Sequence, residues 1–428
     1  MRHRAQRLPR QRGAALVLVV IAMLVLILMA GLALDVGHMM LNKSRLQDGV
    51  DAAALSAAKT LNDTGSTSLA TAAALQALGL DADTAGNGEL ADAYDSADSN
   101  IQVTVQYSST VTTFTPGSAT GPYVRVIATG YTFPAVLSRV AGLTTLGVSA
   151  SAVAGPSPTI NTACNIAPVM ACGLPPSQGG GPGNLWGYQL NAPQVLKSAA
   201  PGSSAVGPGN FQLLQLGGTG DNIVRQNLAG SYQACETSGN TVQTETGNGA
   251  GPVAQGLNTR FGIYTGPMSG TEAQYPPDTV TQISSPPSLT VDSNDNIWWG
   301  ATELTASNID STAGVFSYDD YTAEEASGPY QFAPATDGPG DYGVPGRRVL
   351  TVPVGDCTGT ANGSTTVPVL GFACFFIMQP VTQQGTIDYI IGEFEGNCQV
   401  NGNPGPNPGS GPGPYVIELY RDPGSPDS

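Results

Sequence analysis

Side chains that could carry out catalysis are sparse in this sequence. Its two histidines are His3 and His38, and Lys197 is the single lysine beyond residue 59. Nucleophilic triads need a histidine beside the nucleophile, and histidine zinc sites need several. Acidic pairs at 319–320 and 324–325 resemble glycosidase carboxylates, but in an acidic region such pairs are more often solvated loops. We therefore expect a protein that is not an enzyme.

One pattern of oxygen-bearing residues could hold a metal ion. Asp292, Asn294, Asn296 and Glu303 stand at positions 1, 3, 5 and 12 of a calcium-binding loop. Position 6 of such loops is glycine, whereas here it is Ile297. An Asx-rich turn is the alternative interpretation. Calcium is thus the one cofactor that the sequence suggests, and we expect no other.

The cysteines indicate the compartment in which the chain folds. Their number is even, all lie beyond residue 160, and none forms a CxxC metal motif; they are Cys164, Cys172, Cys235, Cys357, Cys374 and Cys398. Oxidising compartments favour disulfides, so we expect at least two among them. Fifteen pairings are open, and buried free thiols are the alternative.

An uncharged apolar run, residues 13–34, must position everything that follows it. Its 22 residues as a helix cover roughly 33 Å, enough to cross a bilayer. Five arginines stand in residues 1–12, against Lys43 and Arg45 after the run. This asymmetry predicts a cytoplasmic tail (1–12), a transmembrane helix (13–34) and an exported remainder that is periplasmic or extracellular. A cleaved secretory signal is the alternative, although its apolar part is usually shorter.

Charge and composition describe the exported part. Residues 1–60 carry eight Lys/Arg and three Asp/Glu, whereas the remainder carries eight and twenty-nine. Such an acidic region has no electrostatic surface for nucleic acid. The 55 glycines and 33 prolines favour loop-rich β structure. We expect a single-pass membrane protein with a small α+β domain and a β-rich, disulfide-containing exported domain.

Residues 35–155 are predicted to form the α+β domain next to the membrane. Leu46, Val50, Ala54, Ala57 and Leu61 recur at helical spacing, so the membrane helix should continue to about residue 59. Its apolar stripe is covered either by its own domain, which we favour, or by a partner subunit. We further expect a helix at 67–80, a polar loop to 100, strands at 101–107, 111–115, 122–128 and 146–154, and a short helix at 133–140.

The second exported domain is predicted at 160–400. Short β-like runs separated by Gly/Pro turns fill it, among them residues 251–262 and the apolar run 367–380, which is too short to span a membrane and indicates a buried strand. Residues 401–414 are a Pro/Gly linker. Residues 415–428 hold a strand and a frayed end.

The membrane segment also resembles a known family. Arg12-Gly13-Ala14-Ala15 at the membrane entry, Gly31, Ala33, Asp35 and Gly37 at the exit, and the LQ-x3-DAAALxAA run of residues 46–58 resemble the TadE/TadG-like proteins of tight-adherence (Flp-type) pilus assembly. The strand at 122–128, the short helix at 133–140 and the SASAVAG sequence at 149–155 extend this resemblance to residue 155. Leu18 stands where cleaved pseudopilins have glutamate, which favours the uncleaved TadG-like member.

The resemblance implies a non-enzymatic structural component of a Tad-type pilus apparatus. Its partners would be the membrane and other platform or pseudopilin proteins, contacted through small residues of the span such as Ala30 and Gly31. The alternative is an envelope-anchored adhesive or binding protein that shares only the anchor. The partner subunit and the oligomeric state stay open.

Overall fold

The chain divides into two compact units, and each is described by itself. The first holds Met1–Gly155 and Glu418–Ser428, and the second holds Pro156–Ile417. The computed structural model describes residues 12–95, 101–117, 121–197, 210–247, 249–285, 288–333, 342–358, 363–381, 389–396, 398–403 and 413–425. The predicted basic tail, apart from Arg12, and residues 404–412 of the predicted linker lie outside this range.

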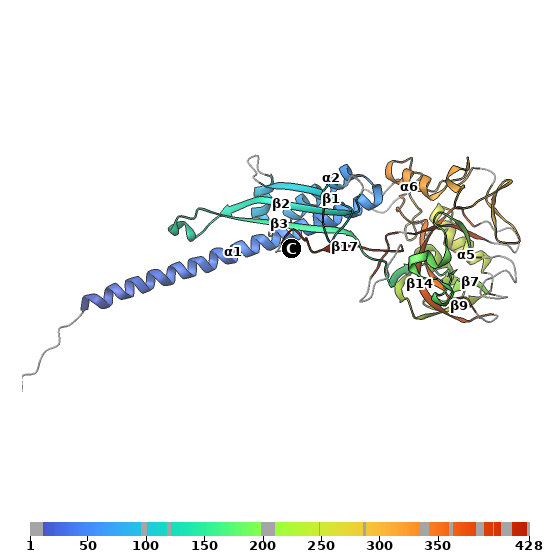
Figure 1. Cartoon of the computed structure of the whole chain (residues 1–428), viewed down its shortest axis with the longest axis horizontal. Coiled ribbons are helices and arrows are strands. Elements are labelled where there is room, and N and C mark those ends of the chain that lie inside the picture. The colour runs from blue at the N-terminus through green and yellow to red at the C-terminus, as the bar shows by residue number, and fades with distance from the viewer. Residues whose placement is uncertain are drawn as a thin grey trace, which may run out of the picture. The chain divides into compact units, whose positions relative to one another are not determined.

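One helix, α1 (Arg12–Thr64), dominates the first unit. Its 53 residues extend for about 80 Å, and its N-terminal half projects beyond the rest of the unit (Figure 1). The helix continues past the expected end at Lys59, because Leu61 prolongs the buried stripe. It stops at Gly65, whose φ of +63° is left-handed and whose N–H bonds to Leu61 O at 2.8 Å.

A four-stranded sheet packs against the C-terminal half of α1. Its order is β1 (Gln102–Ser108), β2 (Tyr123–Pro134), β3 (Thr145–Pro156) and β17 (Ile417–Tyr420), with β1–β2 and β2–β3 antiparallel. The last strand therefore comes from the far end of the chain. Arg125 of β2 bonds to Asp422 at 3.3 Å, which holds the segment after β17 on the same sheet.

Three expectations for the first unit were wrong. The expected polar loop contains α3 (Gly88–Asp95) after α2 (Thr67–Ala82), because Leu90 is buried against the unit. The expected strand at 111–115 is irregular, since Ser108 Oγ accepts from Thr110 N and Thr115 N and turns the chain. The expected helix at 133–140 shrinks to a 3₁₀ turn, η1 (Ser138–Ala141).

The second unit is built on a central sheet. Within the described residues this sheet has seven strands, with β5, β13, β14, β15 and β6 in order and β9 joining β14 to β7. Its strands are β5 (Ala171–Cys172), β6 (Pro193–Lys197), β7 (Asn210–Leu214), β9 (Thr241–Thr246), β13 (Val349–Gly355), β14 (Thr366–Ile377) and β15 (Ile390–Glu395). Lys197 is the fully buried last residue of β6.

Both faces of this sheet are covered. On one face, α4 (Asp221–Gly230) and α5 (Ala250–Leu257) pack on Phe375 and its neighbours. On the other, Val280 and buried residues between 289 and 321, with the start of α6 (Tyr318–Ser327), pack on Phe376. Burial on both faces explains why β14 is an almost continuous apolar run, as expected for a buried strand.

Two smaller sheets complete the second unit. They are β16 (Gly402–Asn403), β4 (Thr162–Ile166) and β8 (Tyr232–Thr237), and the β10 (Thr290–Val291), β11 (Ile297–Trp299), β12 (Thr302–Glu303) meander. The expectation of a β-rich unit is confirmed, but the expectation for one of its segments was wrong. Residues 251–262, expected as a β run, form α5 and the turn η4 (Asn258–Phe261), because Val253, Ala254 and Leu257 share one buried helical face.

All six cysteines are paired in the second unit. The disulfides are Cys164–Cys235, Cys172–Cys357 and Cys374–Cys398. The first joins paired residues of β4 and β8, and the second ties the end of β5 to the loop after β13. The prediction of at least two disulfides is confirmed, and the β-rich unit is held by three.

Candidate functional site

The carboxylate of Asp35 joins α1 to the β2–β3 hairpin. It accepts backbone hydrogen bonds from Val136 at 2.8 Å, from Leu137 at 3.2 Å and from Ser138 at 2.5 Å. Asp35 is buried, although it is charged and is the first residue after the apolar run. Three donors on one carboxylate replace the water that this group would otherwise bind. The hairpin tip is therefore fixed to the helix at the end of the predicted membrane span.

A second polar contact lies one to two turns further along α1. Asn42 Nδ2 donates to Glu89 Oε2 at 2.9 Å, and Asn42 Oδ1 accepts from the Tyr131 hydroxyl at 2.9 Å. His38 Nε2 lies 2.6 Å from the same Glu89 oxygen. This network joins α1 to α3 and β2. Sequence reasoning missed Asn42, Glu89 and Tyr131. Positions 31, 35, 38, 42 and 46 continue the apolar stripe toward the membrane at helical spacing, and this spacing could have indicated that Asn42 faces the unit.

Replacing Asp35 by alanine should release the hairpin tip from α1. Three backbone donors would lose a charged acceptor, so we expect the first unit to lose stability. Amide exchange at residues 136–138 should accelerate strongly in the full chain reconstituted in lipid. The matched control is Asp48→Ala, which removes the same charge from an exposed position of α1. Equal exchange in the two variants would contradict a tethering role for Asp35.

The apolar stripe of α1 is covered by its own unit. Leu46, Val50, Ala53, Ala54 and Ala57 are fully buried, and α2, β2 and α3 lie against the helix. The preference for intramolecular cover is thus confirmed.

One small residue of the expected docking surface has an intramolecular neighbour. Gly31 faces Leu137 so closely that an added Cβ would lie 2.7 Å from the Leu137 Cβ. Ala30, by contrast, is exposed. The surface that α1 offers to partners or lipid therefore includes residues 16–30 and the exposed Leu32 and Leu34. The expectation that Gly31 contributes to it was wrong.

The residues of the predicted calcium loop form the tip of the β10–β11 hairpin. Asp292 Oδ1 accepts from Asn294 N at 2.8 Å and from Asn296 N at 3.0 Å, while Oδ2 accepts from Asn296 Nδ2 and Trp298 Nε1. Partial burial acts to raise the pKa of Asp292, but these hydrogen bonds together outweigh it, so the pKa is lowered. Glu303 lies in β12 opposite Trp298. This is the geometry of an Asx turn.

Calcium binding stays a prediction for this hairpin. The Asp292 carboxylate already accepts four hydrogen bonds, so a cation would have to replace some of them. In the part of the chain that the structure describes, no three His, Cys, Asp or Glu side chains gather as a metal site.

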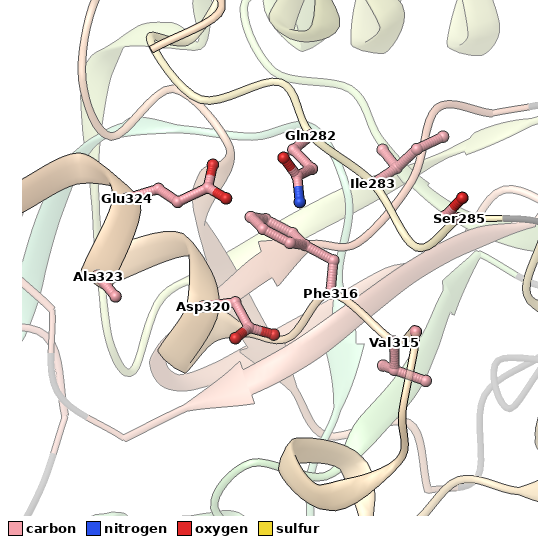
Figure 2. Close-up of a pocket in the computed structure, with 9 residues that line it drawn as sticks. Gln282, Ile283, Ser285, Val315, Phe316, Asp320, Ala323 and Glu324 are labelled. Carbon is pink, nitrogen blue, oxygen red and sulfur yellow. The ribbon is translucent and has the colours of Figure 1, made fainter. Parts of the chain in front are cut away.

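The predicted carboxylate pairs lie on α6 in the second unit. Asp320 caps the helix by accepting from Ser317 N at 3.2 Å, and Glu325 accepts from the Tyr321 hydroxyl at 2.7 Å. Glu324 and Asp320 face a cavity of about 310 Å³ beside Gln282 and Phe316 (Figure 2). Burial, then the neighbouring Asp320 charge, raises the pKa of Glu324. The cavity is acidic and partly aromatic, and these contacts stabilise the helix.

Two glutamates of β15 are buried beside the start of α6, and sequence reasoning missed them. Glu393 and Glu395 alternate along β15 and point to the same face of the sheet. Glu393 Oε2 accepts from Tyr318 N at 2.8 Å, whereas Oε1 of both glutamates accepts no hydrogen bond from a described residue. Burial raises the pKa of Glu393 to about 8 and that of Glu395 to about 9. Both carboxyls are thus protonated at neutral pH.

These glutamates predict that the second unit is most stable under acidic conditions. In the unfolded chain a glutamate ionises near pH 4.3, whereas each of these stays protonated in the folded chain up to about pH 8. The folded state binds more protons over this window, so the free energy of unfolding falls as pH rises. Glu393→Gln should reduce the slope by about 1.4 kcal/mol per pH unit between roughly pH 5 and 8.

Chemical denaturation of the full chain at several pH values measures this slope. The matched control is Asp310→Asn, an exposed carboxylate near the same cluster. If the wild-type slope persists in Glu393→Gln, the buried carboxyl is not the group that titrates.

The fold and this junction together define a class of protein. Among the described residues, one helix is long and apolar enough to cross a membrane. The chain is a single-pass membrane protein whose apolar helix continues into a helix-on-sheet unit and is followed by a β-rich unit with three disulfides.

A family model then connects the anchor to known proteins. The model of the Flp pilus-assembly TadE/G-like proteins matches residues 13–60. This confirms the resemblance over the apolar run, Asp35 and nearly all of the buried stripe. Searches of curated proteins and of solved structures found no match.

Proposed function

We propose that the protein is a non-enzymatic component of a Tad/Flp-type pilus assembly apparatus, of the TadG-like kind. It is anchored in the inner membrane by α1, with the N-terminus in the cytoplasm and both units beyond residue 35 on the exported side. Its partners are other platform or pseudopilin proteins.

The observation that carries this proposal is the family match over residues 13–60. It covers the segment that combines a membrane span with a stripe buried by the chain itself. The five arginines before the span support the orientation, and the disulfides support an oxidising compartment.

The sparse reactive side chains support a structural role. Lys197 is buried in a strand, and the acidic residues of α6 cap or brace their helix. His38 contacts Glu89 and Phe133 at the junction beside the membrane span.

Partner contacts are proposed on the free surface of α1. Its large apolar side chains between Leu16 and Met29 are 43–68% exposed, so they face lipid or another membrane helix. Helices in membranes associate through packing of such surfaces.

The test is made in a bacterium that carries the gene together with pilus genes. Deleting the gene should abolish or strongly reduce surface pili counted by electron microscopy, and the full chain should restore them. Photo-crosslinkers at Leu24 and Leu26, on opposite sides of α1, should capture a platform or pseudopilin protein from at least one side. Leu80 on α2 is the matched control, because it is 63% exposed outside the span.

Unchanged pili after deletion, with no crosslink from either position, would reject the proposal. That result would leave the alternative, an envelope-anchored adhesive or binding protein that shares only the anchor.

A further inference from the structure

The tip of the β2–β3 hairpin lies beside the membrane-spanning part of α1. Strands β2 and β3 run along the helix toward its projecting half (Figure 1). Leu137 closes on Gly31, and Asp35 accepts from the backbone of residues 136–138. These contacts fix the tip at the level of residues 31–35.

This level coincides with the edge of the hydrocarbon layer. A bilayer needs about 20 apolar residues, and 20 residues counted from Gly13, the first after the arginines, end at Leu32. Gly31 lies three residues, or about 4.5 Å, before the end of the apolar run at Leu34. A segment packed on Gly31 therefore lies where acyl chains meet headgroups.

The side chains of the tip suit this environment. Val136 and Leu143 are 60% and 55% exposed, so the unit itself leaves them uncovered. Leu32 and Leu34 of the helix are similarly exposed at the same level, so the apolar surface is continuous with the span. Arg139 between the two tip residues is also exposed and can reach lipid phosphates.

Backbone N–H groups at the tip are hydrogen-bonded within the protein, as a poorly hydrated position requires. Asp35 accepts from residues 136–138, Ala135 N donates to Thr144 O, Gly142 N to Arg139 O, and Leu143 N to Ser138 O. A segment near hydrocarbon must pair such donors internally, because water is scarce there.

We propose that the β2–β3 hairpin tip is a second membrane contact, which inserts Val136 and Leu143 into the outer-leaflet interface while Arg139 binds headgroup phosphates. The bilayer itself is the occupant of this surface. The hairpin and α1 together then fix the first unit at two points on the membrane, so the unit cannot rotate freely about the helix axis.

Lipid-quenching fluorescence on the full chain tests this proposal. The variants Val136→Cys, Leu143→Cys and Leu80→Cys are labelled with an environment-sensitive fluorophore in nanodiscs of phosphatidylcholine and phosphatidylglycerol. Leu80 is the matched exposed control, since neighbouring Leu78 and Asp81 pack against Gly49, about 22 Å along α1 beyond Leu34. Leu32→Cys is the positive control within the span.

With brominated lipid, labels at 136 and 143 should lose at least half of their emission, as the label at 32 does, while the label at 80 is unaffected. Quenching at 32 alone would overturn the proposal, because the tip would then lie in water. Quenching of both tip labels and of the label at 80 would overturn it as well, since contact would not be specific to the tip.

Discussion

Ala54→Glu is expected to unfold the unit next to the membrane, whereas Ala52→Glu is not. Ala54 of α1 is fully buried against the rest of the first unit, whereas Ala52, two residues away on the same helix, is exposed. A glutamate at 54 would place a larger, charged side chain where Ala54 and its neighbours Ala53 and Ala57 are fully buried. An unpaired buried charge and overpacking together should cost about 4 kcal/mol or more.

Limited proteolysis and amide exchange of the full chain in lipid measure this difference. Ala54→Glu should expose α2 and the sheet to protease and lower the amount of protein in the membrane. A variant at 54 that behaves like the one at 52 would mean that a partner, and not the chain itself, covers the stripe.

Arg348→Ala is expected to have the largest effect on the second unit. Its fully buried guanidinium donates to the carbonyls of Val280, Gln282 and Ile377 at 2.7–3.1 Å, and to Met378 O at 3.2 Å. Its ring neighbour Phe376 lies 4.4 Å from the guanidinium carbon. Burial lowers the pKa of Arg348 to about 10, so it remains charged at neutral pH.

Removal of this side chain takes a charged donor away from four buried carbonyls. It also removes one of the three arginine charges near the buried Asp278, while those of Arg260 and Arg347 remain. We expect a loss of about 5 kcal/mol, because each buried carbonyl that loses its hydrogen-bond donor costs about 1–3 kcal/mol. Chemical denaturation of the disulfide-bonded chain measures it. The control is Arg225→Ala, whose side chain bonds to Gln255 and Asn222 at the surface and should change stability by less than about 1 kcal/mol. Similar losses in both variants would contradict a central role for Arg348.

The sequence predicted the parts of the fold that depend on local pattern. An uncharged apolar run, a stripe at helical spacing and alternating β-branched residues placed α1, α2 and the strands β1, β2 and β3, since each pattern fixes its own element. The residues at which helices and strands end were predicted less accurately. The extension of α1 to Thr64 depended on the left-handed Gly65, and β2 ran on through Phe133, which packs against His38 of α1.

Features that depend on distant parts of the chain could not be predicted. Glu89 and Tyr131 are ordinary residues in sequence, and they become a junction only because α3 and β2 meet at Asn42. Burial of Glu393 likewise depends on the N-terminus of α6, 75 residues earlier. A single sequence contains no record of such pairings, so the disulfide partners were also left open.

The position of β17 has a consequence for the timing of biogenesis. The sheet of the first unit keeps an open edge at β3 until β17 arrives, and about 260 residues separate the two strands. At the usual rate of synthesis, roughly 5–20 residues per second, that interval lasts some tens of seconds. During this time the unpaired N–H and C=O groups of the β3 edge can pair with a strand of another chain. The nascent chain must therefore be protected from such pairing until synthesis ends. A premature stop codon anywhere after β3 would make that exposure permanent, and proteases should therefore remove truncated products even when the second unit is nearly complete.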